Sequence, residues 1–209
     1  DHAVEDFDAF VQAPVLLAHA KAKTDELYPT TSMKRVTAGA YRLLEEFFGN
    51  VPISTITKER QKDFLGWASR LPRTQGRGHG RNRHGQAGKI VTKAEEISKA
   101  DADDLLVFEG IRAIADISDA EKRAMLADRL VPRVTLTTLK KQRDAMNRMF
   151  KSAEDLGANV PVPISYREME RHIKSLAPED ALYIRVTKPK IRMPWTKERI
   201  SMLLTSPIY

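Results

Sequence analysis

The sequence predicts a mainly α-helical protein, a helical bundle, for three reasons. Apolar residues recur at intervals of three and four in several long stretches, which places them on one face of a helix. The patterns "TKAE" at 92–95 and "SDAE" at 118–121 each have the form of a capping box that opens a helix. A single stretch, "LYIRV" at 182–186, has the character of a strand. We therefore expect helices around one apolar core, followed by a short carboxy-terminal segment that contains this candidate strand.

Three helices are expected before residue 73. The first is short, is interrupted near Pro14, and buries Val4, Phe7, Phe10, Val11, Leu16, Leu17 and Ala20. After a linker, "YPTTS" at 28–32, the second helix runs to Gly49 and buries Val36, Ala40, Leu43, Leu44, Phe47 and Phe48. Thr57 is expected to cap the third helix, which ends before Pro72 and buries Phe64, Trp67, Ala68 and Leu71.

Five further helices are expected after a glycine-rich loop at 73–89. The capping box at 92–95 opens a short helix, and a stronger one follows that buries Leu105, Phe108, Ile111, Ile114 and Ala115. The box at 118–121 opens a third, which ends near Leu130. The longest helix has Gly157 as its carboxy-terminal cap and buries Leu136, Leu139, Met146, Met149, Phe150, Ala153 and Leu156. A stiff "VPVP" connector then leads to a last helix opened by "SYRE" at 165–168.

The composition sets limits on the class of protein. The chain has 209 residues, enough for one domain or for one domain and part of another. It contains no cysteine, which excludes disulfides and thiolate metal sites and is compatible with a reducing cytoplasm. No apolar run approaches the length of a membrane span, and no signal peptide is visible. We therefore expect no membrane partner.

Charge is segregated along the chain. The net charge is +7, which favours a polyanionic partner. Residues 94–130 hold ten acids and five bases, whereas 73–93 hold six bases and no acid, and 133–151 hold six bases and one acid. Such segregation is expected if one surface of the protein faces phosphate and another does not.

The sequence offers no arrangement typical of an enzyme. Gly88–Lys89 is followed by Ile90, so a phosphate-binding P-loop is excluded, and no His-Glu-x-x-His occurs. His79 and His84 lie in the glycine-rich loop without a cysteine or acidic neighbour, which makes a poor metal site. The adjacent Asp103 and Asp104 point different ways on a helix and are interpreted as a solvated face. No catalytic residue, cofactor or metal is predicted.

The strongest functional signal is the polar side of the longest predicted helix. The residues that lie off its apolar stripe are Thr137, Thr138, Lys140, Lys141, Arg143, Asn147, Arg148 and Lys151. Lysine and arginine bind phosphate, and threonine and asparagine can reach base edges, so this face is a candidate nucleic-acid surface. Charge alone supports an ordinary solvated helix face about equally well.

Two further stretches could contact a phosphate backbone. The loop "RTQGRGHGRNRHGQAGK" offers Arg77, Arg81 and Arg83, and its glycines allow close approach. For this loop alone, a solubilising insertion is the better interpretation. Thr57, Lys58 and Arg60 lie at a predicted helix start, where backbone N–H groups also favour phosphate.

The order of these pieces resembles the amino-terminal half of a tyrosine recombinase of the phage integrase type. The stretches that carry the resemblance are "LLEEFFGNVPISTITKERQKDFLGWASRLP", "LTTLKKQRDAMNRMFKSAEDLGANVP" and "RMPWTKERISMLLTSP". It implies a SAM-like helical core-binding domain at 31–160 with an insertion at 73–130. Residues 1–30 would be an amino-terminal helical segment, and 161–209 a connector and the truncated start of a catalytic domain.

The resemblance also implies a function. The core-binding domain would position duplex DNA for site-specific recombination, or integration, through the Thr57–Arg60 region and the Thr137–Lys151 face. The family's catalytic arginine, lysine, His-x-x-Arg and tyrosine have no counterparts before Tyr209, and the sequence begins with Asp1 rather than methionine. Both ends are therefore interpreted as boundaries within a longer chain. The whole protein would be cytoplasmic, bacterial or phage-encoded, and tetrameric on DNA. The alternatives are a helical protein-interaction module and an RNA-binding module with a basic face.

Overall fold

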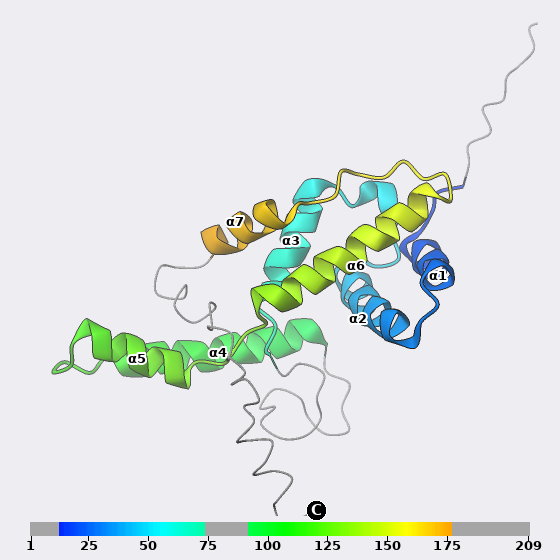
Figure 1. Cartoon of the computed structure of the whole chain (residues 1–209). Helices are drawn as coiled ribbons and strands as arrows, with labels where there is room; N and C mark the ends of the chain where they lie inside the picture. Colours follow the sequence, from blue (N-terminus) through cyan, green and yellow to red (C-terminus); the bar gives the residue numbers. More distant parts are fainter. Residues whose placement is uncertain (1–12, 74–91, 177–209) are drawn as a thin grey trace, which may run out of the picture.

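A computed structural model describes residues 13–73 and 92–176 of the chain (Figure 1). Within these ranges the fold is entirely helical, without a strand, which confirms the predicted mainly α class. The helices are α1 (Leu17–Leu27), α2 (Thr31–Phe48), a short 3-10 helix η1 (Ile53–Thr55), α3 (Lys58–Ser69), α4 (Lys93–Arg112), α5 (Asp119–Arg129), α6 (Leu136–Glu154) and α7 (Tyr166–Leu176). The candidate strand at 182–186, the apolar residues before Pro14 and the histidines of the glycine-rich loop lie outside the described residues.

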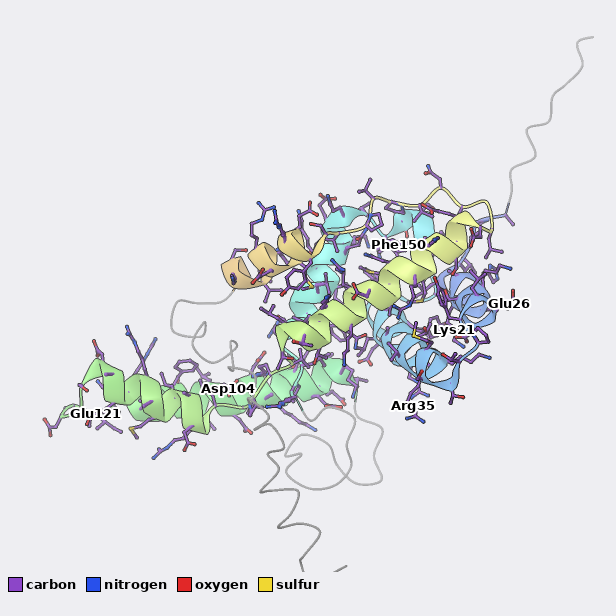
Figure 2. All side chains as sticks on the ribbon, in the orientation of Figure 1. Lys21, Glu26, Arg35, Asp104, Glu121 and Phe150 are labelled. Carbon is purple, nitrogen blue, oxygen red and sulfur yellow. The ribbon has the colours of Figure 1, made fainter. Side chains whose placement is uncertain are left out.

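Helix α6 is the centre of the bundle and packs against α1, α2, α3 and α7 (Figure 1). Its predicted stripe is confirmed, because Leu139, Met146, Met149, Phe150 and Ala153 are all buried. In Figure 2 Phe150 lies on α6 within the bundle. Leu136 and Leu156, at the two ends of the stripe, are only partly buried.

Helices α2 and α3 meet through an aromatic cluster. The rings of Phe47, Phe48, Phe64 and Trp67 stack in edge-on and tilted pairs, with centroids between 4.8 and 6.1 Å apart. Such pairs add to the free energy of area burial. The turn that joins the two helices begins at Gly49, whose φ of 76° lies in the region that side chains disfavour.

The predicted linker at 28–32 is partly wrong, because α2 already begins at Thr31. The helix therefore begins before its predicted apolar pattern, and its first turn holds one apolar residue, the partly buried Met33. Val36 is also placed wrongly on the buried face: it is 41% exposed, and the neighbouring Thr37 is buried instead. Successive residues of a helix are rotated by about 100°, so neighbouring side chains can lie one in the core and one in solvent.

The predicted caps at the starts of helices are confirmed, whereas α6 ends at Glu154 with Asp155 rather than Gly157 as its cap. Thr57 accepts a hydrogen bond from the Arg60 backbone N–H at 3.4 Å. Thr92 with Glu95, and Ser118 with Glu121, form the two predicted capping boxes at the starts of α4 and α5. These contacts satisfy backbone N–H groups that the first helical turn leaves without partners.

One continuous helix, α4, replaces the two that were predicted between 92 and 115. Nothing in that stretch breaks a helix, so the two patterns merge into a helix of 20 residues. Leu105 is 57% exposed rather than buried. The outer part of α4 pairs with α5, and this α4–α5 hairpin projects from the bundle around its own small core of Ile111, Leu126 and Leu130 (Figure 1).

The hairpin is joined to the bundle at a short seam between residues 71–73 and 132–134. The Arg73 N–H donates to the Pro132 carbonyl at 2.7 Å, and the Val134 N–H donates to the Leu71 carbonyl at 3.0 Å. These bonds bring together the points at which the chain leaves the bundle and returns to it.

A buried guanidinium reinforces the seam. Arg133, whose side chain is 4% exposed, forms ion pairs with Asp101, at 2.9 Å, and Asp104. Its other nitrogen donates to the Arg70 carbonyl at 2.6 Å. Asp104, labelled at the root of the hairpin in Figure 2, also accepts from the Val131 N–H at 2.7 Å. Interpreting Asp104 as part of a solvated face was therefore wrong.

The bundle extends on both sides of the range 31–160 expected for the core-binding domain. Helix α1 packs on α6 and α2, and α7 packs on α3 and α6. Between α1 and α6, the Thr24 hydroxyl lies 2.8 Å from the Ser152 hydroxyl, and both residues are buried.

Candidate nucleic-acid interface

The exposed side of α6 carries a row of cations. Lys140, Lys141 and Lys151 are exposed, as is Thr137 at the start of the helix. The eleven residue steps from Lys140 to Lys151 correspond to a rise of about 16 Å along the helix axis. None of the three lysines forms an ion pair with a carboxylate in the described parts of the chain. Their charge is therefore available to an external anion.

The other predicted residues of α6 are less accessible than the pattern suggested. The side chain of Arg143 is 15% exposed, and it forms an ion pair with the adjacent Asp144. Thr138 lies 3.2 Å, hydroxyl to hydroxyl, from the capping residue Thr135. These side chains have internal partners that a ligand would have to displace.

Asn147 and Arg148 are partly buried at the edges of the α6 face. The Asn147 Oδ1 and the Arg148 Nε are enclosed and have no hydrogen-bond partner in the described structure. A buried polar atom without a partner costs free energy. The predicted role of Asn147 as a base reader therefore requires this side chain to turn outward.

The start of α3 uses its predicted contact residues within the protein. Lys58 forms an ion pair with Glu168 of α7 at 2.6 Å. Arg60 donates to the Thr55 carbonyl at 2.9 Å, and its guanidinium lies 5.0 Å from the centre of the Phe48 ring. Thr57 is the helix cap. This region therefore contributes less free charge to the surface than the sequence alone predicted.

The carboxylate partner of Lys58 is strongly acidic. The hydrogen bond from the Lys58 ammonium, followed by those from the Ser165 side chain and backbone, lowers the pKa of Glu168 from 4.5 to about 2. Each of these contacts favours the charged form of the carboxylate. The Lys58–Glu168 pair is thus fully ionised at neutral pH and links the first turns of α3 and α7.

Helix α7 continues the basic surface beyond α6, and sequence reasoning missed it. Arg167, Arg171 and Lys174 are exposed at the spacing i, i+4, i+7. The Lys140 ammonium lies 5.9 Å from the centre of the Tyr166 ring, at the start of α7. The spacing was visible in "SYREMERHIKSL", but only its capping pattern was used.

The remaining predicted contacts, Arg77, Arg81 and Arg83, lie outside the described residues. The 14 candidate residues therefore divide into three groups. The exposed group is Thr137, Lys140, Lys141 and Lys151. The group with internal partners or partial burial is Thr57, Lys58, Arg60, Thr138, Arg143, Asn147 and Arg148. The structure does not describe the loop arginines.

A pocket lies between α3 and α7. Its lining includes Asp63, Trp67, Ser69, Arg70 and His172. The Ser69 hydroxyl donates to the Gly66 carbonyl at 2.7 Å, and no hydrogen bond joins it to His172. The pocket therefore lacks a serine activated by a neighbouring base.

Across residues 13–73 and 92–176, no group of three His, Asp or Glu side chains could hold a metal ion. No helix in the described part of the chain is long and apolar enough to cross a membrane.

Comparisons of the chain with protein-family models, curated proteins and solved structures found no match. What the basic surface binds is therefore inferred from its own side chains and charges.

Proposed function

We propose that this chain binds duplex DNA as the core-binding part of a tyrosine recombinase of the integrase type. The observation that supports this most is the row of Lys140, Lys141 and Lys151 on the open side of α6, without carboxylate partners among the described residues. Release of counterions from DNA phosphates would drive binding to such a row.

In the proposed role, the chain positions DNA rather than cleaving it. Helix α6 lies along the duplex with its lysines on phosphate oxygens, while its opposite face remains in the bundle core. Strand cleavage and rejoining would be the task of a catalytic domain of the resembled family. The whole protein would be a cytoplasmic recombinase, encoded by a bacterium or a phage, that assembles as a tetramer on two DNA sites.

The experiment compares two triple variants with equal loss of charge. The first is K140Q/K141Q/K151Q on α6. The matched control is K99Q/R112Q/R129Q, which removes three exposed cations from α4 and α5. Affinity for duplex DNA is measured by fluorescence anisotropy across a salt series, and a denaturant melt of each variant checks the fold.

The α6 variant should bind all duplex sequences more weakly. The slope of log affinity against log salt should flatten by up to about 2.7, since each lost phosphate contact contributes about 0.9. The control should keep the wild-type slope. Equal losses in both variants would mean that net charge alone attracts DNA. Tighter binding to RNA or to single strands than to duplex DNA would favour the RNA-binding alternative.

A further inference from the structure

The outer face of α7 is a second cationic row. Arg167, Arg171 and Lys174 are exposed, while Met169 and Ile173 on the opposite face are buried in the core. Four residues of helix rise about 6 Å, so the two guanidinium groups emerge one helical turn apart. The core fixes the rotation of α7, so this row faces outward.

The carboxylates of α7 leave the two arginines unpaired. Glu168 is bound to Lys58 and to the Ser165 backbone N–H, at 2.6 and 2.9 Å. Glu170 forms its ion pair with Lys174, at 3.0 Å. Within the described ranges, no ion pair involves Arg167 or Arg171. Lys174 is partly neutralised, and the uncompensated charge is that of the arginines.

The arginine row is joined to the lysines of α6. The Arg171 Nε lies 3.4 Å from the Arg167 carbonyl, so this side chain is directed back toward the start of α7. At that start, Tyr166 lies beneath the Lys140 ammonium. In the described structure, neither Lys140 nor Arg167 forms an ion pair with a carboxylate. The positive charge therefore continues from the α6 lysines to the α7 arginines.

We propose that Arg167 and Arg171 form a second phosphate-binding segment, which extends the DNA contact of α6 onto α7. This inference rests on the proposed function, because it assigns further contacts to the same DNA. Guanidinium groups suit this position, since each can donate two parallel hydrogen bonds to the oxygens of one phosphate. The duplex would then be held by lysines on one helix and by arginines on the next.

The test variant is R167Q/R171Q, and its matched control is R112Q/R129Q. Both variants lose two exposed arginines, but Arg112 and Arg129 lie on the hairpin. The α7 variant should flatten the salt slope by about 1.8. The fall in affinity from about 50 to about 200 mM salt should therefore shrink by about tenfold relative to the control. The conservative R167K/R171K variant should restore the slope, but only part of the affinity.

Each outcome is decisive. If wild type and control bind duplex DNA, the α6 triple variant loses slope and R167Q/R171Q equals its control, then α7 does not contact DNA and the proposed function survives. If wild type does not bind duplex DNA, both proposals fail. An unchanged denaturant melt separates lost contacts from lost structure. If R167Q/R171Q is destabilised, the single variants R167Q and R171Q are compared with R112Q. A salt slope equal to that of R112Q in both single variants, each folded as wild type, also overturns the proposal.

Discussion

The buried side-chain amide of Gln61 holds the backbone of Ile164, more than a hundred residues away in the sequence. The Gln61 Oε1 accepts from the Ile164 N–H at 2.8 Å. The Nε2 donates to the Ile56 and Val162 carbonyls, each at 3.2 Å. Gln61 is fully buried, so water cannot replace these bonds. The contact places the connector before α7 against the start of α3.

The substitution Gln61→Leu should lower the free energy of unfolding by at least about 1–3 kcal/mol. The leucine has a similar size but leaves the Ile164 N–H buried without an acceptor, and each such group costs about this much. Gln142→Leu is the matched control, because the Oε1 of Gln142 is already enclosed without a partner. Urea melts of both variants measure the difference, and equal stabilities would show that the amide does not hold the connector.

The Lys58–Glu168 pair predicts a pH dependence. Folding lowers the pKa of Glu168 from 4.5 to about 2, so its contribution to stability is complete above about pH 4.5 and is lost as the pH falls to about 2. Glu168→Gln should therefore be less stable than wild type at neutral pH and should equal it near pH 2. Both side chains are about one third exposed, so high salt should reduce the difference in stability between wild type and Glu168→Gln.

Urea melts from pH 2 to pH 7, at low and high salt, measure this gap. Glu109→Gln removes one exposed carboxylate from the hairpin and serves as the control. A gap that stays constant over the whole pH range would contradict the assignment of the stabilisation to the charged carboxylate.

Arg133→Met should destabilise the attachment of the hairpin by about 3 kcal/mol. Removal of the guanidinium leaves the largely buried carboxylate of Asp104 without its cation. An uncompensated buried charge destabilises the folded state strongly. Exposed Arg129→Met should change stability by less than about 0.5 kcal/mol. Amide hydrogen exchange should report the loss first in α4 and α5. Wild-type exchange rates in both helices would show that the ion pair does not secure the hairpin.

Two glycines of the α2 region should respond in opposite ways to alanine. Gly49 has φ 76° and ψ −175°, a conformation that essentially only glycine adopts, so Gly49→Ala should cost about 1–3 kcal/mol. Gly39 lies within α2 with open space where a Cβ would be added, so Gly39→Ala should stabilise by about 0.5–1 kcal/mol. Thermal melts of the pair test this, and a shift of the same sign in both would contradict it.

The helices could be predicted because their signals are local. Capping boxes act over three residues, and an apolar stripe such as that of α6 repeats within each turn. The start of α2 and the continuity of α4 were missed for the same reason. The first turn of α2 holds a single apolar residue, Met33, and the capping box of α4 opens a helix that runs on through the apolar residues assigned to a second helix.

The candidate site was harder to predict, because exposure depends on distant residues. The sequence indicates that Lys58 is a cation at a helix start, but its partner is 110 residues further along the chain. Asp104 pairs with Arg133 across the hairpin, and no local pattern joins them. Arg143 is the exception, since its partner Asp144 was adjacent and could have been considered.

The seam at residues 71–73 and 132–134 has a consequence for how the chain could be divided. The turn between α4 and α5, at 113–118, is largely exposed and makes no contact with the main core. A cut there would leave α1, α2 and α3 on one polypeptide and α6 and α7 on the other. The buried interfaces between these two sets would still hold them together. When the two fragments are coexpressed, they should therefore associate into one folded complex. Each fragment expressed alone should fail to fold.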